Sequence, residues 1–282
     1  MILVTGAAGK TGSAVVAALA RRGKKVRALV RRPQQGTALK ALGAFEISLG
    51  AFEDAAALDH AVGGATAIYH ICPNVGESEL AYARSVVAAA QTHRVRRFVF
   101  HSVLHPQIEA MPHHWQKLRA EEMLFIGGFD LTILQPTAYM QNILGAWPGV
   151  LSDGVFRVPY PIETRLSLVD LDDVAEAAAI VLTENGHAGA TYELVGTEPL
   201  SQSDVASVIG AVLGRPVRAE AESVEAWAAR ARMGDYECAT LVKMFQYYAQ
   251  CGLVGNPNTL RWLLGRTPNS LEQFLMREKL RA

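Results

Sequence analysis

Three glycines spaced three residues apart stand near the start of the chain, directly after a short apolar run. Gly6 would permit a tight turn, Gly9 would bring the backbone close to a phosphate, and Gly12 would let a following helix pack closely. A helix that begins near Lys10 would point its unpaired N–H groups and the positive end of its dipole at the same anion. The pattern therefore predicts a site for the pyrophosphate of a dinucleotide. We expect it to be formed by Thr5, Gly6, Ala8, Gly9, Lys10, Thr11 and Gly12.

The second apolar run ends in two arginines, which indicate the kind of dinucleotide. A site selective for NAD usually carries an acidic residue here to hold the ribose 2′-hydroxyl, but no carboxylate follows until Glu46. The guanidinium groups of Arg31 and Arg32 suit the 2′-phosphate of NADP(H) instead. The alternative is that both arginines are only the solvated end of a strand. We predict NADP(H) as the cofactor.

The elements that must position these residues alternate regularly along the chain. Near-continuous apolar runs separated by amphipathic segments are typical of a parallel sheet that helices cover on both faces. We therefore predict an α/β fold with a doubly wound parallel Rossmann sheet, whose ligand crevice lies at the carboxyl ends of the strands. The predicted strands are residues 2–4, 25–30, 44–48, 65–71, 97–102, 131–134 and 191–195, and the helices between them 13–22, 35–42, 54–62, 79–92, 115–126 and 170–183.

The later part of the chain departs from this regular alternation of apolar runs and amphipathic segments. Residues 1–145, joined by 166–196, are predicted to form the dinucleotide-binding domain, and residues 146–165 and 197–282 a smaller lobe that binds substrate. Prolines, glycines and aromatics in 147–165 indicate loop and short strand. We expect the lobe to be mostly helical, without a strand set of its own. Its predicted helices are residues 203–213, 224–233, 236–249, 258–264 and 270–280.

Three further loops should open at the carboxyl edge of the sheet, after the fourth, fifth and sixth strands. From these loops we expect Cys72, Pro73 and Pro136 to contact the cofactor. Ser102 could hold a substrate oxygen or the nicotinamide ribose, or it could only satisfy backbone at a strand end. Lys117, one turn into the next helix, could hold the ribose hydroxyls, or it could be an ordinary exposed lysine. A packed thiol is expected at Cys72 rather than a reactive one.

The amino-acid composition argues against several classes of binding partner. The chain has 282 residues, half of them hydrophobic, with 27 acidic and 27 basic residues, which argues against nucleic acid or an anionic membrane as partner. Three cysteines without metal or redox spacing indicate reduced thiols, a cytoplasmic location and no metal site. The chain starts in a predicted core strand and has no apolar run of membrane-spanning length, so we expect neither a signal peptide nor a membrane segment. A homodimer is left open.

An ordered set of short motifs resembles the NmrA-like branch of atypical short-chain dehydrogenases. The motifs are TGAAGKTG (5–12), RALVR (27–31), HSVLHP (101–106), HHWQK (113–117), TILQP (132–136), LSQSDVA (200–206), LGRPV (213–217) and LGRTP (264–268). The resemblance implies an NADPH-dependent reductase of quinones, triphenylmethane dyes or isoflavonoid-type aromatics. The same branch also includes redox-sensing regulators that bind NADP(H) and catalyse nothing, which is the alternative function. The resemblance also raises Lys117 and Ser102 as catalytic candidates.

One position departs from ordinary short-chain dehydrogenases. In those enzymes a tyrosine four residues before the lysine donates a proton to the reduced carbonyl, whereas this chain has His113, followed by His114. His113 could be the acid, with Lys117 lowering its pKa. Alternatively, the acceptor needs no strong acid, as with a quinone or a cationic dye, and this is the account we favour. A third interpretation makes both histidines surface residues at a helix start.

The expected cover of the crevice is rich in aromatic and thioether side chains, although most of them could equally be core. Such a lining suits a small apolar or aromatic substrate. The candidate substrate contacts are Asn74, His105, His114, Tyr139, Met140, Asn142, Tyr160 and Trp227.

Overall fold

The computed structural model describes residues 1–73 and 75–280, which divide into two compact units. The first unit carries the glycine-rich segment and comprises Met1–Gln107, His113–Gln135 and Val174–Tyr192. The second comprises Ile108–Pro112, Pro136–Asp173 and the described residues from Glu193 onward. Asn74, one of the predicted substrate contacts, lies outside the described residues.

The first unit is built on a seven-stranded sheet, as predicted. Its strand order is β10-β6-β5-β4-β1-β2-β3, and neighbouring strands run parallel. The chain moves outward from β1 in one direction and then restarts from β4 in the other. The crevice that binds ligands in such sheets lies at this switch point, outside the carboxyl ends of β1 and β4. The strands are β1 (Ile2–Val4), β2 (Val26–Val30), β3 (Glu46–Leu49), β4 (Ala67–His70), β5 (Arg97–His101), β6 (Asp130–Pro136) and β10 (Ala190–Leu194).

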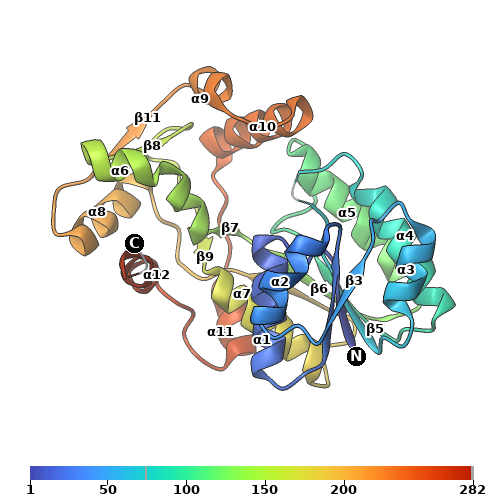
Figure 1. Ribbon diagram of the computed structural model, residues 1–282. Coiled ribbons are helices and arrows are strands. Elements are labelled where there is room, and N and C mark those ends of the chain that lie inside the picture. Colours follow the sequence, from blue (N-terminus) through green and yellow to red (C-terminus); the bar gives the residue numbers. More distant parts are fainter. Residues whose placement is uncertain (74, 281–282) are drawn as a thin grey trace. The chain divides into compact units, whose positions relative to one another are not determined.

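Helices cover both faces of this sheet (Figure 1). One face packs against α3 (Ala55–Val62), α4 (Glu79–Thr92) and α5 (Pro112–Phe125) through a continuous apolar core that includes Phe98 and Phe100. The other face carries α1 (Lys10–Arg21), α2 (Pro33–Ala41) and α7 (Leu171–Thr183). Burial on both faces explains why the strands are almost uninterrupted apolar runs.

The second unit contains two small sheets, so the prediction of a lobe without strands of its own is wrong. β8 (Val155–Val158) pairs in parallel with β11 (Arg218–Ala221), and β7 (Ala138–Tyr139) pairs in parallel with β9 (Leu168–Val169). β11 reads Arg-Ala-Glu-Ala, which carries no β-branched or aromatic residue, so its pairing with β8 overrides its weak strand propensity.

The prediction of loop and short strand over residues 147–165 is wrong at its start, because α6 (Trp147–Asp153) is a helix. Pro148 lies in the first turn of α6, where proline is tolerated, and Gly154 ends the helix in a left-handed conformation. The remaining helices are a 3₁₀ segment (Met140–Ala146), α8 (Gln202–Leu213), α9 (Val224–Arg230), α10 (Asp235–Cys251), α11 (Asn258–Leu264) and α12 (Leu271–Lys279).

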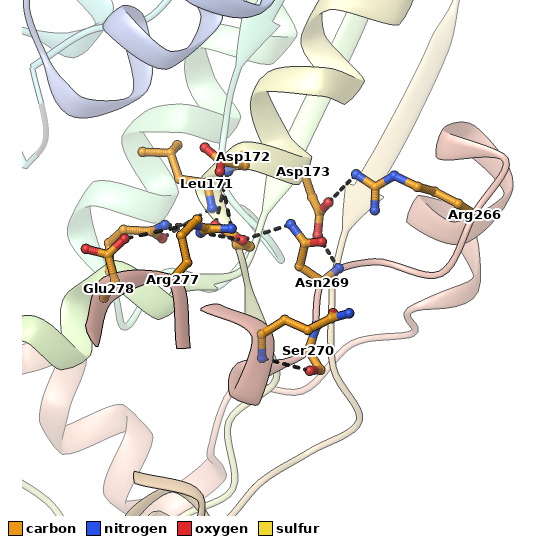
Figure 2. Close-up of polar contacts among 11 residues, drawn as sticks. Leu171, Asp172, Asp173, Arg266, Asn269, Ser270, Arg277 and Glu278 are labelled. Carbon is orange, nitrogen blue, oxygen red and sulfur yellow. Dashed lines mark hydrogen bonds and ion pairs between the residues drawn. The ribbon is translucent and has the colours of Figure 1, made fainter. Parts of the chain in front are cut away.

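A buried cluster of charges joins the segment around α12 to the start of α7 (Figure 2). Asp170 accepts two hydrogen bonds from the guanidinium group of Arg277, at 2.8 and 3.0 Å, and one from the Asn269 amide at 2.9 Å. Asp173 accepts from Arg266 and from the backbone N–H of Asn269, both at 2.6 Å. Both carboxylates are fully buried, so the arginines and the asparagine compensate charges that water does not reach.

No helix among the described residues is both long enough and apolar enough to cross a membrane.

Candidate functional site

The turn after β1 has a shape that only glycine fits at two positions. Gly6 has φ +57°, and a Cβ on it would lie 2.6 Å from the carbonyl oxygen of Ile71. A Cβ on Gly12 would lie 2.3 Å from the carbonyl oxygen of Gly6. The start of α1 therefore lies directly against the turn, and the turn lies against the residue that follows β4.

The amino end of α1 faces the carboxyl edge of the sheet without a capping side chain. Its N-cap is Gly9, which has no side chain to accept a hydrogen bond from the first-turn N–H groups. Ala8, Gly9 and Lys10 are exposed, whereas Thr11 and Gly12 are buried. An exposed helix start with positive dipole and no cap of its own suits a phosphate group. The residues present therefore fit the pyrophosphate of a dinucleotide.

Arg31 and Arg32 follow β2 at the same edge, and both side chains are exposed. Their backbone N–H groups donate to the side-chain oxygen of Gln35, at 3.2 and 3.0 Å, which fixes this turn at the start of α2. Arg31 also contributes to the lowered pKa of Glu53, whose main cause is the hydrogen bond from Tyr82. Two exposed guanidinium groups on an ordered backbone suit a phosphate monoester.

Lys117 is not an ordinary exposed lysine. Its ammonium nitrogen Nζ lies 2.8 Å from Oε1 of Glu79 and donates to the carbonyl oxygen of His101 at 3.1 Å. It lies 5.1 Å from the centre of the Phe100 ring. Only 14% of the lysine side chain and 4% of the glutamate side chain are exposed. The cation therefore sits at the carboxyl end of β5, paired with a carboxylate from α4.

Two buried histidines lie beside Lys117, at the carboxyl ends of neighbouring strands. Nδ1 of His70 lies 2.8 Å from the Thr5 hydroxyl, and Nδ1 of His101 lies 2.6 Å from the Tyr69 hydroxyl. Burial, with a smaller effect of Lys117, lowers the pKa of each imidazole to about 3. Both rings are therefore neutral near pH 7 and act as hydrogen-bonding groups.

Cys72 is a packed thiol. Its Sγ lies 3.4 Å from Nε2 of His70 and 3.8 Å from the backbone oxygen of Glu79. Burial first, and the nearby carboxylate of Glu79 second, raise the pKa of the thiol well above its usual value. Pro73, the next residue, is exposed.

Ser102 is buried, and its hydroxyl donates to Glu121 on α5. The amide of Gln135 donates to both oxygens of the same carboxylate, at 2.9 and 3.2 Å. Burial raises the pKa of Glu121, although the hydrogen bonds from Ser102 and Gln135 and the charge of Lys117 oppose the effect. The serine hydroxyl thus satisfies a buried acid on α5, whereas the alternative that the sequence left open had it satisfy backbone at the strand end. Pro136, a predicted cofactor contact, is buried at the end of β6.

α5 begins at Pro112, three residues earlier than predicted, so His113 and His114 lie in its first turn. Their rings pack edge to face with centres 4.5 Å apart. His114 is 1% exposed, and its Nδ1 lies 3.2 Å from the backbone oxygen of His105. The interpretation of both histidines as surface residues is therefore wrong for His114. His105 itself has φ +53°, an uncommon backbone conformation for a residue with a side chain.

Burial lowers the pKa of the His113 imidazole from its ordinary value to about 3 and that of His114 to about 4. The charge of Lys117 adds a smaller lowering to both. Nδ1 of His113 is buried without a hydrogen-bond partner among the described residues. At neutral pH both rings are uncharged, which is unfavourable for a strong acid.

The remaining substrate candidates lie in the second unit. Tyr160 and Trp227 both pack against Phe245, with ring centres 5.9 and 4.7 Å apart, and Tyr160 also packs against Tyr248 at 5.9 Å. Burial raises the pKa of the Tyr160 and Tyr248 phenols well above the ordinary value. Met140 is fully buried, Tyr139 is partly buried and Asn142 is exposed. Met140 is therefore part of the core of this unit.

Sequence reasoning missed several residues of the site. Glu79, the partner of Lys117, gave only the weak signal of an acid in the first turn of a predicted helix. The buried pair likewise joins Ser102, at a strand end, to Glu121 on α5, which lies 19 residues later in the chain. His70 and His101 could have been noticed as polar residues at the ends of two apolar strands.

Similarity to known proteins extends over nearly the whole chain, and a model of the NmrA-like family matches residues 1–276. The chain is 34% identical over 226 residues to a (4-alkanoyl-5-oxo-2,5-dihydrofuran-3-yl)methyl phosphate reductase of Streptomyces griseus, covering 80% of this chain and 78% of the relative. It is 30% identical over 227 residues to an NAD(P)H azoreductase of Xenophilus azovorans, with the same coverage. An NADPH-dependent quinone oxidoreductase of Escherichia coli, solved with NADPH, matches with a TM-score of 0.88 and 26% identity, over 99% of this chain and 100% of that chain.

Proposed function

Because this chain belongs to the NmrA-like family, we propose that it is an NADPH-dependent reductase that transfers a hydride to a small apolar acceptor, aromatic or quinone-like. The observation that carries the proposal is the uncapped, exposed start of α1 at the same sheet edge as Arg31 and Arg32. The relatives support it, since those with the highest identity given above are named as reductases.

In this proposal the residues of the first unit bind and orient the dinucleotide. The N–H groups at the start of α1 hold the pyrophosphate, and Arg31 and Arg32 hold the 2′-phosphate. Lys117 donates a hydrogen bond to the nicotinamide ribose. The bound cofactor supplies the hydride, and the protein contributes mainly by fixing the positions of the reactants.

The protonation step favours an acceptor that needs no strong protein acid. Since the pKa of His113 is about 3, its imidazole is neutral at working pH and holds no extra proton to give. Hydride addition to a quinone leaves a stabilised oxyanion, and addition to a cationic dye leaves a neutral product. Water can protonate the first, and the second needs no proton at all.

The test is a panel of acceptors incubated with purified protein and NADPH, with loss of NADPH absorbance as the readout. The panel contains a naphthoquinone, a triphenylmethane dye, an azo dye and an unsaturated lactone phosphate of the kind that the Streptomyces relative reduces. We expect saturable NADPH oxidation with at least one acceptor, and slower oxidation with NADH.

The alternative is a regulatory protein that senses NADP(H) without turnover. It predicts NADPH binding by calorimetry together with no oxidation above the rate without protein for every acceptor of the panel. That result would overturn the reductase and favour the regulator.

A further inference from the structure

We propose that Glu79 is a positioning residue that holds the ammonium group of Lys117 in place for the cofactor. The inference rests on the proposed function, because it assumes that Lys117 contacts the nicotinamide ribose. Neither the glutamate nor its helix was singled out by the sequence for any role in the site. Three features of the structure support it: the geometry of the pair, its isolation from water, and the way in which Glu79 is itself anchored.

The geometry leaves one donor of Lys117 for a ligand. An ammonium group has three N–H donors, and among the described residues two acceptors meet it, Oε1 of Glu79 at 2.8 Å and the oxygen of His101 at 3.1 Å. These contacts come from α4 and β5, so they fix the ammonium group from two directions. Without the carboxylate, the described contacts that would restrain it are the His101 carbonyl and the Phe100 ring.

The pair is largely removed from water, with exposed fractions of 14% for the lysine side chain and 4% for the glutamate side chain. Two long side chains that pair on a surface contribute little, but a buried cation that loses its anion is strongly disfavoured. Other polar groups around Lys117 cannot replace Glu79. The imidazoles of His70, His101, His113 and His114 are neutral near pH 7, and Glu121 already accepts from Ser102 and Gln135.

Glu79 is anchored at the start of α4, next to a residue that follows β4. It is the first residue of α4, where the helix dipole favours a carboxylate. Its backbone oxygen lies 3.8 Å from Sγ of Cys72, just beyond the end of β4. The position of the lysine is thereby linked to Cys72, a residue also predicted to contact the dinucleotide.

A double-mutant cycle tests whether Glu79 acts through Lys117. Wild type, Glu79→Gln, Lys117→Met and the double variant are compared for kcat, KM and the Kd of NADPH, at a temperature where thermal unfolding shows all four to be folded. Glutamine keeps the size of the side chain and removes its charge. We expect Glu79→Gln to lower kcat by about tenfold while KM for the acceptor changes by less than about threefold.

In the Lys117→Met background the same substitution should have no further effect on kcat or on the Kd of NADPH, because the group that it positions is gone. Glu77→Gln is the matched control. Glu77 is exposed on the same segment, and its substitution should leave all three quantities unchanged. Equal losses from Glu79→Gln in both backgrounds, or no loss in the wild-type background, would overturn the inference.

The same proteins separate this inference from the proposed function. Wild-type protein that binds NADPH but reduces no acceptor refutes the reductase, while the cycle in the Kd of NADPH still decides the role of Glu79. Wild-type protein that neither binds nor oxidises NADPH refutes both.

Discussion

At the scale of single residues, the choice of dinucleotide depends on exposed charge at the end of β2. Replacing Arg31 with Asp should weaken NADPH binding by about tenfold or more, because a charge-assisted hydrogen bond to the 2′-phosphate contributes about 1.5–3 kcal/mol and the new carboxylate repels it. NADH binding should change by less than about threefold. Calorimetry with both dinucleotides measures the difference.

Arg96 offers a matched control for this substitution. It is 86% exposed and immediately precedes β5, at the opposite edge of the sheet, so Arg96→Asp makes the same change in charge away from the crevice. Its affinity for NADPH should stay at the wild-type value. Equal losses of NADPH and NADH affinity in Arg31→Asp would refute a 2′-phosphate site.

The role of His113 can be decided by its removal. Because burial lowers the pKa of its imidazole to about 3, the ring stays neutral and should not be the proton donor at working pH. We expect His113→Phe to keep kcat within about threefold of wild type from acid to alkaline pH. A steady-state pH profile measures this. A loss of kcat that follows the titration of the missing imidazole would identify His113 as the acid after all.

The residues that could be predicted are those with a local signal. The glycine spacing, the arginines that end a strand and the lysine one turn into a helix are all visible within a few positions of sequence. Glu79 could not be paired with Lys117 in this way, because 38 residues separate them and the sheet decides which helices meet. The same holds for Ser102, whose partner Glu121 lies on the following helix.

At the scale of elements, the start of α7 depends on the charges that α12 and the segment before it supply (Figure 2). Asp170→Asn leaves the Arg277 guanidinium group without its buried carboxylate, and should lower the free energy of unfolding by about 3 kcal/mol. Hydrogen bonds from Arg277 and Gln141 hold the pKa of Asp170 below its usual value although burial alone would raise it. Urea unfolding followed by circular dichroism measures the loss.

The neighbouring residue Asp172 makes a useful comparison. Its side chain is 54% exposed and lies 3.3 Å from the same arginine, so Asp172→Asn should reduce stability by less than about 1 kcal/mol. If both substitutions reduce stability equally, burial of the pair is not what makes it important.

Strands of the first unit could be predicted because most are short, nearly uninterrupted apolar runs, and among the helices α4 has the predicted bounds. α6 was missed because a proline that starts a helix looks the same in sequence as one in a loop. β11 was missed because its residues favour no strand and form one only against β8.

At the scale of the whole molecule, buried histidines make stability depend on pH. The imidazoles of His70, His101, His113 and His114 have pKa values of about 3 to 4, against an ordinary value of 6.5. Below pH 6.5 the unfolded chain therefore binds protons that the folded protein does not. The free energy of unfolding should fall as pH is lowered, by about 1 kcal/mol or more per pH unit.

Urea titrations at intervals between about pH 7 and about pH 5 would measure this slope. Repeating them in concentrated salt screens surface charge but not buried groups, so the slope should persist. A stability that is flat or rises as pH is lowered would contradict the buried, neutral state of these rings.

The strand β10 is synthesised long after β6, the strand that it pairs with. β10 pairs beside β6, yet residues 137–189, which include all of α6 and α7, separate the two in the chain. During synthesis the outer edge of β6 therefore stays open until the ribosome has passed the end of β10, and an open strand edge is a template for intermolecular pairing. A fragment that ends after β6 would leave this strand edge permanently unpaired. A nucleotide-binding fragment should therefore join the segment up to β6 to the segment that contains β10 through a linker.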